Sequence, residues 1–173
     1  SGGAGSRTGG SKGKMASAVR EYLLVDGYNI IFAWEELREL SKVTIDGARQ
    51  KLMDILCNYQ GFHKCELILV FDAYRVANHK TEVLDYHNIH VVYTKEAETA
   101  DQYIEKFAHE NGKKYNVTVA TSDGLEQIII RGQGCRLLSA RELKDEIERT
   151  KKTLFEEHPQ DSKKLSHSLK DML

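Results

Sequence analysis

Three aspartates of this sequence each stand where a short apolar segment ends. Asp26 closes the first segment, Asp72 directly follows the second, and Asp123 comes soon after the fourth. If these segments are parallel strands, their carboxyl ends meet at one edge of a sheet, where such sheets bind ligands. A lone aspartate in such a place is equally well explained as a turn former or a helix N-cap. Three of them together predict a shared acidic site.

The third apolar segment leads into two further acids, Glu98 and Asp101. Placed three residues apart at the expected start of a helix, they share one helix face, and a helix N-terminus favours negative side chains. Glu98 could instead cap the helix, with Thr99 as the first helical residue. That alternative leaves Asp101 unexplained, because its spacing turns it back toward the sheet edge. We therefore expect a fourth aspartate at the same edge.

A cluster of carboxylates without fixed cations repels itself, and a bound divalent cation relieves that repulsion. The candidate ligands are carboxylate and amide oxygens with no histidine or cysteine among them, which favours Mg²⁺ or Mn²⁺ over zinc. Mg²⁺ held by few carboxylates keeps water ligands that serve chemistry at phosphate. The acids therefore predict a metal-dependent reaction of a phosphate ester.

The elements that must position these acids alternate between two kinds of sequence. Short apolar runs, typical of strands buried on both faces of a parallel sheet, cover 22–26, 66–71, 89–93 and 116–120, with a weaker run at 135–138. Apolar residues at helical spacing predict helices at about 46–60, 99–111, 124–131 and 140–157. This alternation predicts an α/β sandwich with right-handed crossovers and a mostly parallel, five-stranded sheet.

The charge balance of the chain excludes a protein that grips nucleic acid by charge alone. Its 173 residues include 25 basic and 26 acidic ones, a net charge of −1. The first 20 residues carry a charge of +4, from Arg7, Lys12, Lys14 and Arg20. The remainder holds 21 basic and 26 acidic residues, a charge of −5.

Length and composition predict one globular domain. Residues 1–18 have the Gly/Ser/Lys composition of a flexible linker or a cloning remnant, residues 19–157 carry the alternating pattern, and residues 158–173 form a polar tail. No apolar run approaches the roughly 18 residues of a membrane helix, so we expect a soluble protein. The cysteines Cys57, Cys65 and Cys135 are odd in number and lack zinc-ligand spacing, which indicates reduced thiols and a cytoplasmic location.

The spacing of residues in this sequence does not match other common catalytic motifs. The sequence has neither a GxxxxGK[ST] phosphate loop nor a GxGxxG turn. Ser122 lacks the context of a nucleophile elbow, which argues against a Ser-His-Asp hydrolase.

Several segments, in order along the chain, resemble the YacP-type branch of the NYN family, within the PIN-like nuclease superfamily. They are VDGYNI at 25–30, VFDAYR at 70–75, YTKEAETAD at 93–101, VATSD at 119–123, LEQ at 125–127 and LSARE at 138–142. The match runs over about residues 21–149, nearly the whole expected domain. The resemblance implies a PIN-like, three-layer α/β/α fold and a metal-dependent endoribonuclease, with the YacP branch linked to ribosome-associated cleavage of mRNA.

The same resemblance implies an acidic pocket that holds Mg²⁺ or Mn²⁺. Its catalytic and metal-binding members would be the four aspartates Asp26, Asp72, Asp101 and Asp123. Glu98 would be a further metal ligand, and Asn29 and Ser122 would support the pocket. Two departures from the family pattern, Phe32 in place of a small residue and Gly124 in place of an aromatic one, touch no proposed ligand.

The sequence also resembles a domain that some bacterial proteins carry behind a translation-factor GTPase. RNA, the ribosome and an attached GTPase are therefore the expected partners, and residues 1–18 would then mark a tether. Basic residues near the acidic segments are the candidates for contacts with RNA: Arg75, Lys80, Lys95 and Arg131. Basic groups interleaved with tyrosines such as Tyr86 fit phosphate contacts and base stacking on single strands, although such charges could also be a solvated face and Tyr86 could be core.

Two alternatives stay open from the sequence. One is a catalytically silent PIN-like module that docks on RNA or the ribosome. This alternative does not explain why the chain would keep a complete set of carboxylates that repel one another. The other, less favoured, is a metal-dependent phosphatase or DNA nuclease. Acids and a metal ion indicate chemistry at a phosphate ester, but they do not indicate which sugar the substrate contains.

Overall fold

The structure is a computed structural model that describes residues 19–73 and 81–157. Within these residues a six-stranded sheet has the strand order β3-β4-β2-β1-β5-β6. Five strands run parallel, namely β1 (Glu21–Asp26), β2 (Glu66–Phe71), β4 (Ile89–Tyr93), β5 (Asn116–Ala120) and β6 (Arg136–Leu138). The edge strand β3 (Glu82–Tyr86) pairs antiparallel with β4.

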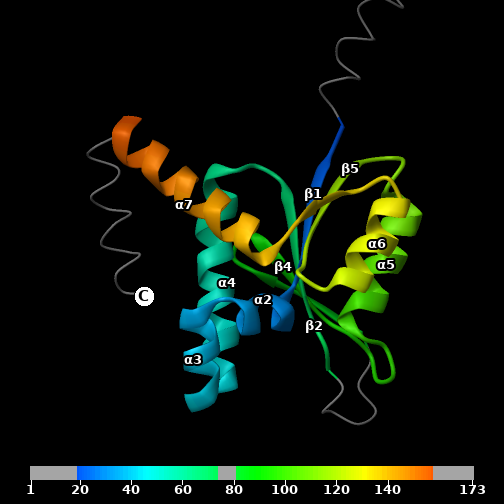
Figure 1. The fold of residues 1–173 in the computed structure, drawn as a ribbon, viewed down its shortest axis with the longest axis horizontal. Helices are drawn as coiled ribbons and strands as arrows, with labels where there is room; N and C mark the ends of the chain where they lie inside the picture. Colours follow the sequence, from blue (N-terminus) through cyan, green and yellow to red (C-terminus); the bar gives the residue numbers. More distant parts are fainter. Residues whose placement is uncertain (1–18, 74–80, 158–173) are drawn as a thin grey trace, which may run out of the picture.

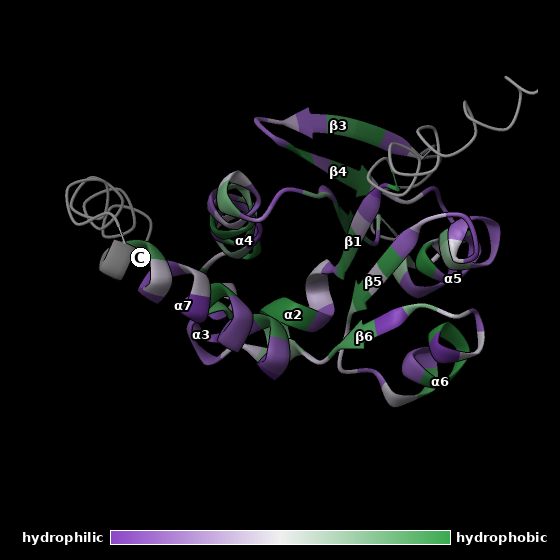
Figure 2. Ribbon diagram, turned by 90° about the horizontal axis from the view of Figure 1, so that it is seen from above, coloured by the Kyte–Doolittle hydropathy of each residue, from purple (hydrophilic) through white to green (hydrophobic). Residues whose placement is uncertain are grey.

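Helices cover both faces of this sheet (Figures 1 and 2). One face packs against α2 (Gly27–Ala33), α3 (Glu35–Val43), α4 (Ile45–Phe62) and α7 (Ala140–Glu157). The opposite face packs against α5 (Ala100–Asn111) and α6 (Gly124–Gly132). The three-layer arrangement and the mostly parallel sheet confirm the predicted fold class.

The central strands supply both hydrophobic cores because their side chains alternate between the two faces. In β1, Leu23 and Val25 belong to the core beneath α4 and α7, whereas Leu24 belongs to the core beneath α5. Adjacent β2 repeats this pattern, with Leu69 on one side and Val70 on the other. Burial on both faces explains why these strands read as continuous apolar runs.

The sheet has one strand more than the five that the sequence patterns predict. The added strand, β3, is largely exposed, with Val83 and Leu84 58% and 47% accessible. It lies at the sheet edge and leads into β4 through a turn in which His87 has a φ of 54°. An exposed edge strand lacks the apolar run of a buried one, so the pattern did not indicate it.

The sequence patterns also did not predict the two helices α2 and α3, which lie within residues 27–43. They are joined at Trp34, whose indole Nε1 donates a hydrogen bond to the carbonyl of Ala140 at 2.8 Å. Trp34 and the buried side chains Ile30, Ile31 and Leu37 hold both helices against the sheet and α7. Packing, rather than a long helical pattern, creates this pair.

None of the helices in the two described ranges is both long enough and apolar enough to cross a membrane. The three cysteines, all within those ranges, are free thiols, as expected. Burial raises the pKa of Cys57 and of Cys65 to about 11, which keeps both thiols protonated and unreactive at neutral pH. The expected linker at 1–18 and the expected tail at 158–173 lie outside the described residues.

Candidate acidic site at the carboxyl edge of the sheet

Asp26 ends β1 and occupies the N-cap position of α2, yet its side chain makes no capping hydrogen bond. The strand passes directly into the helix at Gly27, where a Cβ atom would collide with the ring of Phe71 on β2. This close junction leaves Asp26 only 8% exposed. Helix capping therefore does not account for an acid that is buried at the sheet edge.

Asp72 and Asp101 meet at the N-terminus of α5. Asp72 follows β2, and its Oδ1 accepts a hydrogen bond from the backbone N–H of Ala100 at 2.5 Å. Asp101 lies in the first turn of the helix and accepts a hydrogen bond from the hydroxyl of Thr99. The positive end of the helix dipole favours both carboxylates at this point.

Glu98 does not cap α5, so the capping alternative for this residue is wrong. The N-cap is Thr99, which forms a capping box with Gln102. The backbone carbonyl of Glu98 accepts a hydrogen bond from the Thr94 hydroxyl at 2.7 Å. Its charge raises the pKa of Tyr103, where burial is the larger cause. These contacts do not join Glu98 to the aspartates, and its part in a metal site stays a prediction.

Asp123 is the N-cap of α6, and its Oδ1 accepts the backbone N–H of Glu126 at 3.0 Å. Capping thus explains one of its carboxylate oxygens. The charges of Asp123 and Asp101 both raise the pKa of Glu105, a half-buried acid of α5, after a larger effect of burial. Glu105 is therefore close enough to both Asp101 and Asp123 for their charges to act on it, and no motif of the sequence marks it.

The most deeply buried acid of the site is Glu126, which the sequence analysis also missed. It lies in the first turn of α6 and is 1% exposed. Its Oε2 accepts a hydrogen bond from the buried hydroxyl of Thr121 at 3.0 Å, and its Oε1 has no hydrogen-bond donor among the described residues. The carboxyl group lies within hydrogen-bond reach of that of Asp26.

Two carboxyl groups in contact must share a proton or a cation, because two charges cannot be buried together without compensation. Burial, followed by the charge of Asp26, raises the pKa of Glu126 to about 9. Burial also raises the pKa of Asp26 to about 6, although a hydrogen bond from Glu126 opposes this rise. In the metal-free protein at neutral pH, Glu126 is therefore the protonated partner and donates to Asp26.

Charge repulsion links this pair to the other acids at the edge. The charges of Asp72 and Asp101 add to the raised pKa of Asp26, and Asp101 also acts on Glu126. Burial is the main cause of the raised pKa of Asp72, and Asp101 contributes to it. Four segments distant in the chain thus contribute carboxyl groups to this edge, at Asp26, at Asp72, at the start of α5 and at the start of α6.

Asn29 and Ser122 connect the two halves of the site. Asn29 Oδ1 accepts a hydrogen bond from the backbone N–H of Ser122 at 2.8 Å, and its own backbone N–H lowers the pKa of Asp26 without completing a capping hydrogen bond. The hydroxyl of Ser122 accepts a hydrogen bond from the backbone N–H of Ala140, the first residue of α7, at 2.9 Å. Both residues hold the scaffold of the acidic edge together.

The expected basic residues are placed unevenly. Lys95 is exposed just after β4, at the same sheet edge as the acids. Arg131 lies in the last turn of α6, whereas Asp123 caps the first, so the helix separates them. Arg75 and Lys80 lie outside the described residues. Tyr86 is half-buried against the core and donates a hydrogen bond to Asp54 at 2.6 Å, so it is not an open stacking surface.

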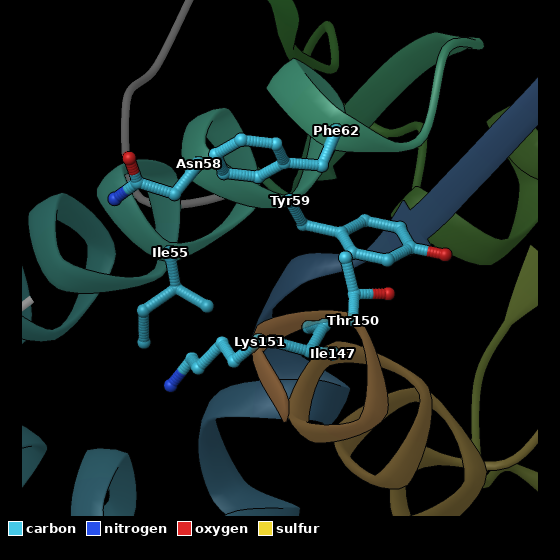
Figure 3. Close-up of a pocket in the computed structure, with 7 residues that line it drawn as sticks. All are labelled: Ile55, Asn58, Tyr59, Phe62, Ile147, Thr150 and Lys151. Carbon is cyan, nitrogen blue, oxygen red and sulfur yellow. The ribbon is translucent and has the colours of Figure 1, made fainter. Parts of the chain in front are cut away.

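Of two hollows in the surface, one lies away from the acidic site and the other borders it. A small apolar pocket between α4 and α7 contains none of the acids, and Figure 3 shows its seven lining residues, Ile55, Asn58, Tyr59, Phe62, Ile147, Thr150 and Lys151. A more open groove between the start of α3 and the first turns of α7 includes Ser122 and so borders the acidic edge. Arg141 and Lys144 line this groove together with several acids.

The donor set of the edge fits a hard divalent cation, because it consists of carboxylate oxygens without histidine or cysteine. The unpartnered Oε1 of Glu126 supports this fit. Within the described ranges, however, no group of three or more His, Cys, Asp or Glu side chains is drawn together closely enough to hold a metal. A cation would therefore have to draw the carboxylates inward.

Comparison with known proteins agrees with this architecture. The model of the YacP-like NYN domain family matches residues 23–173. The protein YacP of Bacillus subtilis (strain 168) is 43% identical over 129 residues, covering 74% of this chain and 75% of YacP. The crystal structure of Rae1 (YacP) from Bacillus subtilis has a TM-score of 0.64 at 37% identity, covering 87% of this chain and 90% of Rae1. A crystallised point mutant of Rae1 has a TM-score of 0.66 at 40% identity, covering 77% of each chain. The chain therefore belongs to the YacP-like NYN domain family, whose domain is of the PIN-like nuclease type.

Proposed function

We propose that this protein is a metal-dependent endoribonuclease that cleaves single-stranded RNA, with mRNA in a ribosomal context as its substrate. The observation that carries the proposal is the set of mutually interacting carboxyl groups at the carboxyl edge of the sheet, centred on the buried pair Asp26 and Glu126. Membership of a nuclease-type family supports the same chemistry.

Asp26, Asp72, Asp101 and Asp123 would hold one or two Mg²⁺ or Mn²⁺ ions, with Glu98 as an additional ligand. When bound, such an ion lowers the pKa of a water molecule and offsets the charge that develops on phosphate oxygens. The protein residues supply the order that this requires. The hydrogen bond from Ala100 holds Asp72, and the hydrogen bond to Ser122 holds the loop of Asp123 against Asn29.

Affinity for RNA must come from outside the acidic edge, because that edge repels phosphate until a cation is bound. Lys95 stands at the rim, and the groove beside Ser122 adds Arg141, whose side chain is 87% exposed. These few cations suit a weak contact with a single strand. The ribosome or an attached translation-factor GTPase would supply the remaining affinity.

The test is cleavage of labelled single-stranded RNA, with and without ribosomes, in Mg²⁺, Mn²⁺ or EDTA. Asp26→Asn and Asp101→Asn should abolish cleavage and leave the fold intact, because each removes one charge and keeps the shape of the side chain. Asp85→Asn is the matched control, since this exposed acid of β3 pairs only with His90 among the contacts described. Full activity in either site variant, or in excess chelator, would contradict the proposal.

A second candidate is a silent docking module, and the absence of a preformed metal cluster from the described residues favours it. Such a module would bind RNA or the ribosome and would not need a cation. Calorimetric titration with Mg²⁺ and Mn²⁺ separates the two functions. No binding at millimolar concentrations would support docking, whereas binding that Asp26→Asn removes would support the nuclease.

A further inference from the structure

Glu126 is buried at a cost that the fold alone does not explain. Helix α6 carries three large apolar side chains that stay accessible, Leu125 at 71%, Ile128 at 67% and Ile129 at 37%, while Glu126 is 1% exposed. The hydrophobic effect favours the opposite orientation, in which the apolar residues are buried and the carboxyl group is in water. The same face of α6 buries Ile130 completely, so this face places one apolar side chain in the core and one carboxyl group beneath the site.

The backbone holds Glu126 in this orientation. Its N–H donates to Asp123 Oδ1 at 3.0 Å, and the next residue, Gln127, donates from Nε2 to the carbonyl of Thr121 at 2.7 Å. The Thr121 hydroxyl accepts the N–H of Asp123 at 3.1 Å and donates its hydrogen to Glu126 Oε2. The side chain is therefore directed inward by the turn itself, and it has no route to solvent.

One oxygen of this side chain accepts no hydrogen bond from the described residues. Buried polar atoms in native proteins nearly always have a partner, so an exception requires an explanation. Glu126 Oε1 has no donor in the described part of the chain, and the ion pairs found there do not include Glu126, Asp26 or Asp101. The neighbours of Glu126 are instead the acids Asp26 and Asp101. Glu126 Oε1 therefore accepts no hydrogen bond from these residues, and its carboxyl group is in contact with that of Asp26, an arrangement of two carboxyl groups that a shared cation satisfies.

We propose that Glu126 is a ligand of the same divalent cation as Asp26, and that its Oε1 binds the cation from the buried side of the acidic edge. This inference rests on the proposed function only in its requirement for a divalent cation. Removal of the carboxylate should therefore weaken metal binding itself, whether or not RNA is present.

The test is the affinity of the RNA-free protein for Mn²⁺, measured by calorimetry and by electron paramagnetic resonance of unbound Mn²⁺. Glu126→Gln should lower the affinity at least about ten-fold. Glu110→Gln, the same change at an exposed position of α5, should keep the wild-type affinity. Glu126→Gln should also keep or raise the melting temperature of the metal-free protein, because glutamine can still accept from Thr121 and can donate to Asp26.

A purely structural role for Glu126 predicts the reverse, a lower melting temperature with unchanged Mn²⁺ affinity, and that result would overturn the inference. If Glu126→Gln does not fold, Glu126→Asp retains the charge with a shorter reach and should still bind Mn²⁺ more weakly than the wild type. Wild-type affinity in Glu126→Asp would then overturn it, as would a wild-type protein that binds no Mn²⁺. RNA cleavage is measured in a separate assay. The nuclease proposal can therefore fail while Glu126 is still shown to bind the cation, and the assignment of Glu126 can fail while RNA is still cleaved.

Discussion

The side chain of Asn29 accepts a hydrogen bond from the backbone N–H of Ser122 at 2.8 Å, across 93 positions of the chain. This contact joins the first turn of α2, which follows Asp26, to the loop that precedes Asp123. The ends of β1 and β5 are neighbours in the sheet, and Asn29 bridges the two loops that leave them.

Replacement of Asn29 by alanine should lower the free energy of unfolding by about 1 kcal/mol, because one hydrogen bond between the two loops is lost. Asn29→Asp retains the accepting oxygen and should lose less stability at a pH where the new acid is protonated. Urea unfolding of both variants at pH 4 and pH 7 checks this. Equal losses in the two variants at pH 4 would show that the hydrogen bond to Ser122 does not stabilise the fold.

A methyl group at Gly27 should disrupt the β1 to α2 junction. The added Cβ would overlap the buried ring of Phe71, so Gly27→Ala should destabilise the protein by roughly 1–3 kcal/mol and displace the neighbouring Asp26. Gly124→Ala is the matched control, because a Cβ at this first residue of α6 meets no atom within 4 Å. It should be neutral or stabilising by less than about 1 kcal/mol.

Thermal unfolding of the two alanine variants gives the comparison directly. Similar melting temperatures for both would mean that Phe71 moves aside freely and that the glycine is not required by packing.

The stability of the metal-free protein should fall as the pH rises. The pKa of Asp26 is raised from 3.8 to about 6 and that of Glu126 from 4.5 to about 9, mainly by burial. The folded protein thus binds these protons more tightly than the unfolded chain does. The contribution of the pair is fully present below about pH 4 and is lost as the pH increases toward 9.

Glu126→Gln has no proton to lose at this position, so its stability should decline less than that of the wild type between pH 6 and pH 9. Denaturant unfolding in EDTA across this range measures the difference. Parallel declines in the two proteins would mean that Glu126 does not hold its proton more tightly in the folded state.

Loss of the Ser122 hydroxyl should weaken the start of α7. The hydroxyl accepts the N–H of Ala140, so Ser122→Ala should cost about 1 kcal/mol of stability and leave Mn²⁺ affinity unchanged. Ser139→Ala is the comparison, because Ser139 Oγ accepts the N–H of Glu142 in the same helix turn at 3.0 Å. The two variants should lose similar stability. A marked loss of Mn²⁺ affinity in Ser122→Ala alone would instead place its hydroxyl in the cation site.

The sequence was sufficient for the parallel strands and for the places of three aspartates in the fold. Asp26, Asp72 and Asp101 stand beside buried strands or a helix start, so local patterns locate them once the strands are recognised. The same patterns missed α2, whose sequence GYNIIFA is short and contains glycine, asparagine and β-branched residues with low helix propensity. It is helical because Ile30 and Ile31 are fully buried against the sheet.

Glu126 marks the limit of what the sequence determines. Glu126 stands three residues after the N-cap Asp123, the position from which the glutamate of a capping box reaches back to the N–H of the N-cap residue. In the structure the Thr121 hydroxyl accepts that N–H instead, and Glu126 turns inward toward Asp26. The order of the amino acids alone thus determined which strands carry acids at their ends, because alternation and burial are local properties of a strand. Only the tertiary structure decided which face of α6 is buried, because that choice depends on how the helix meets β1 and β5, whose residues are distant in the chain.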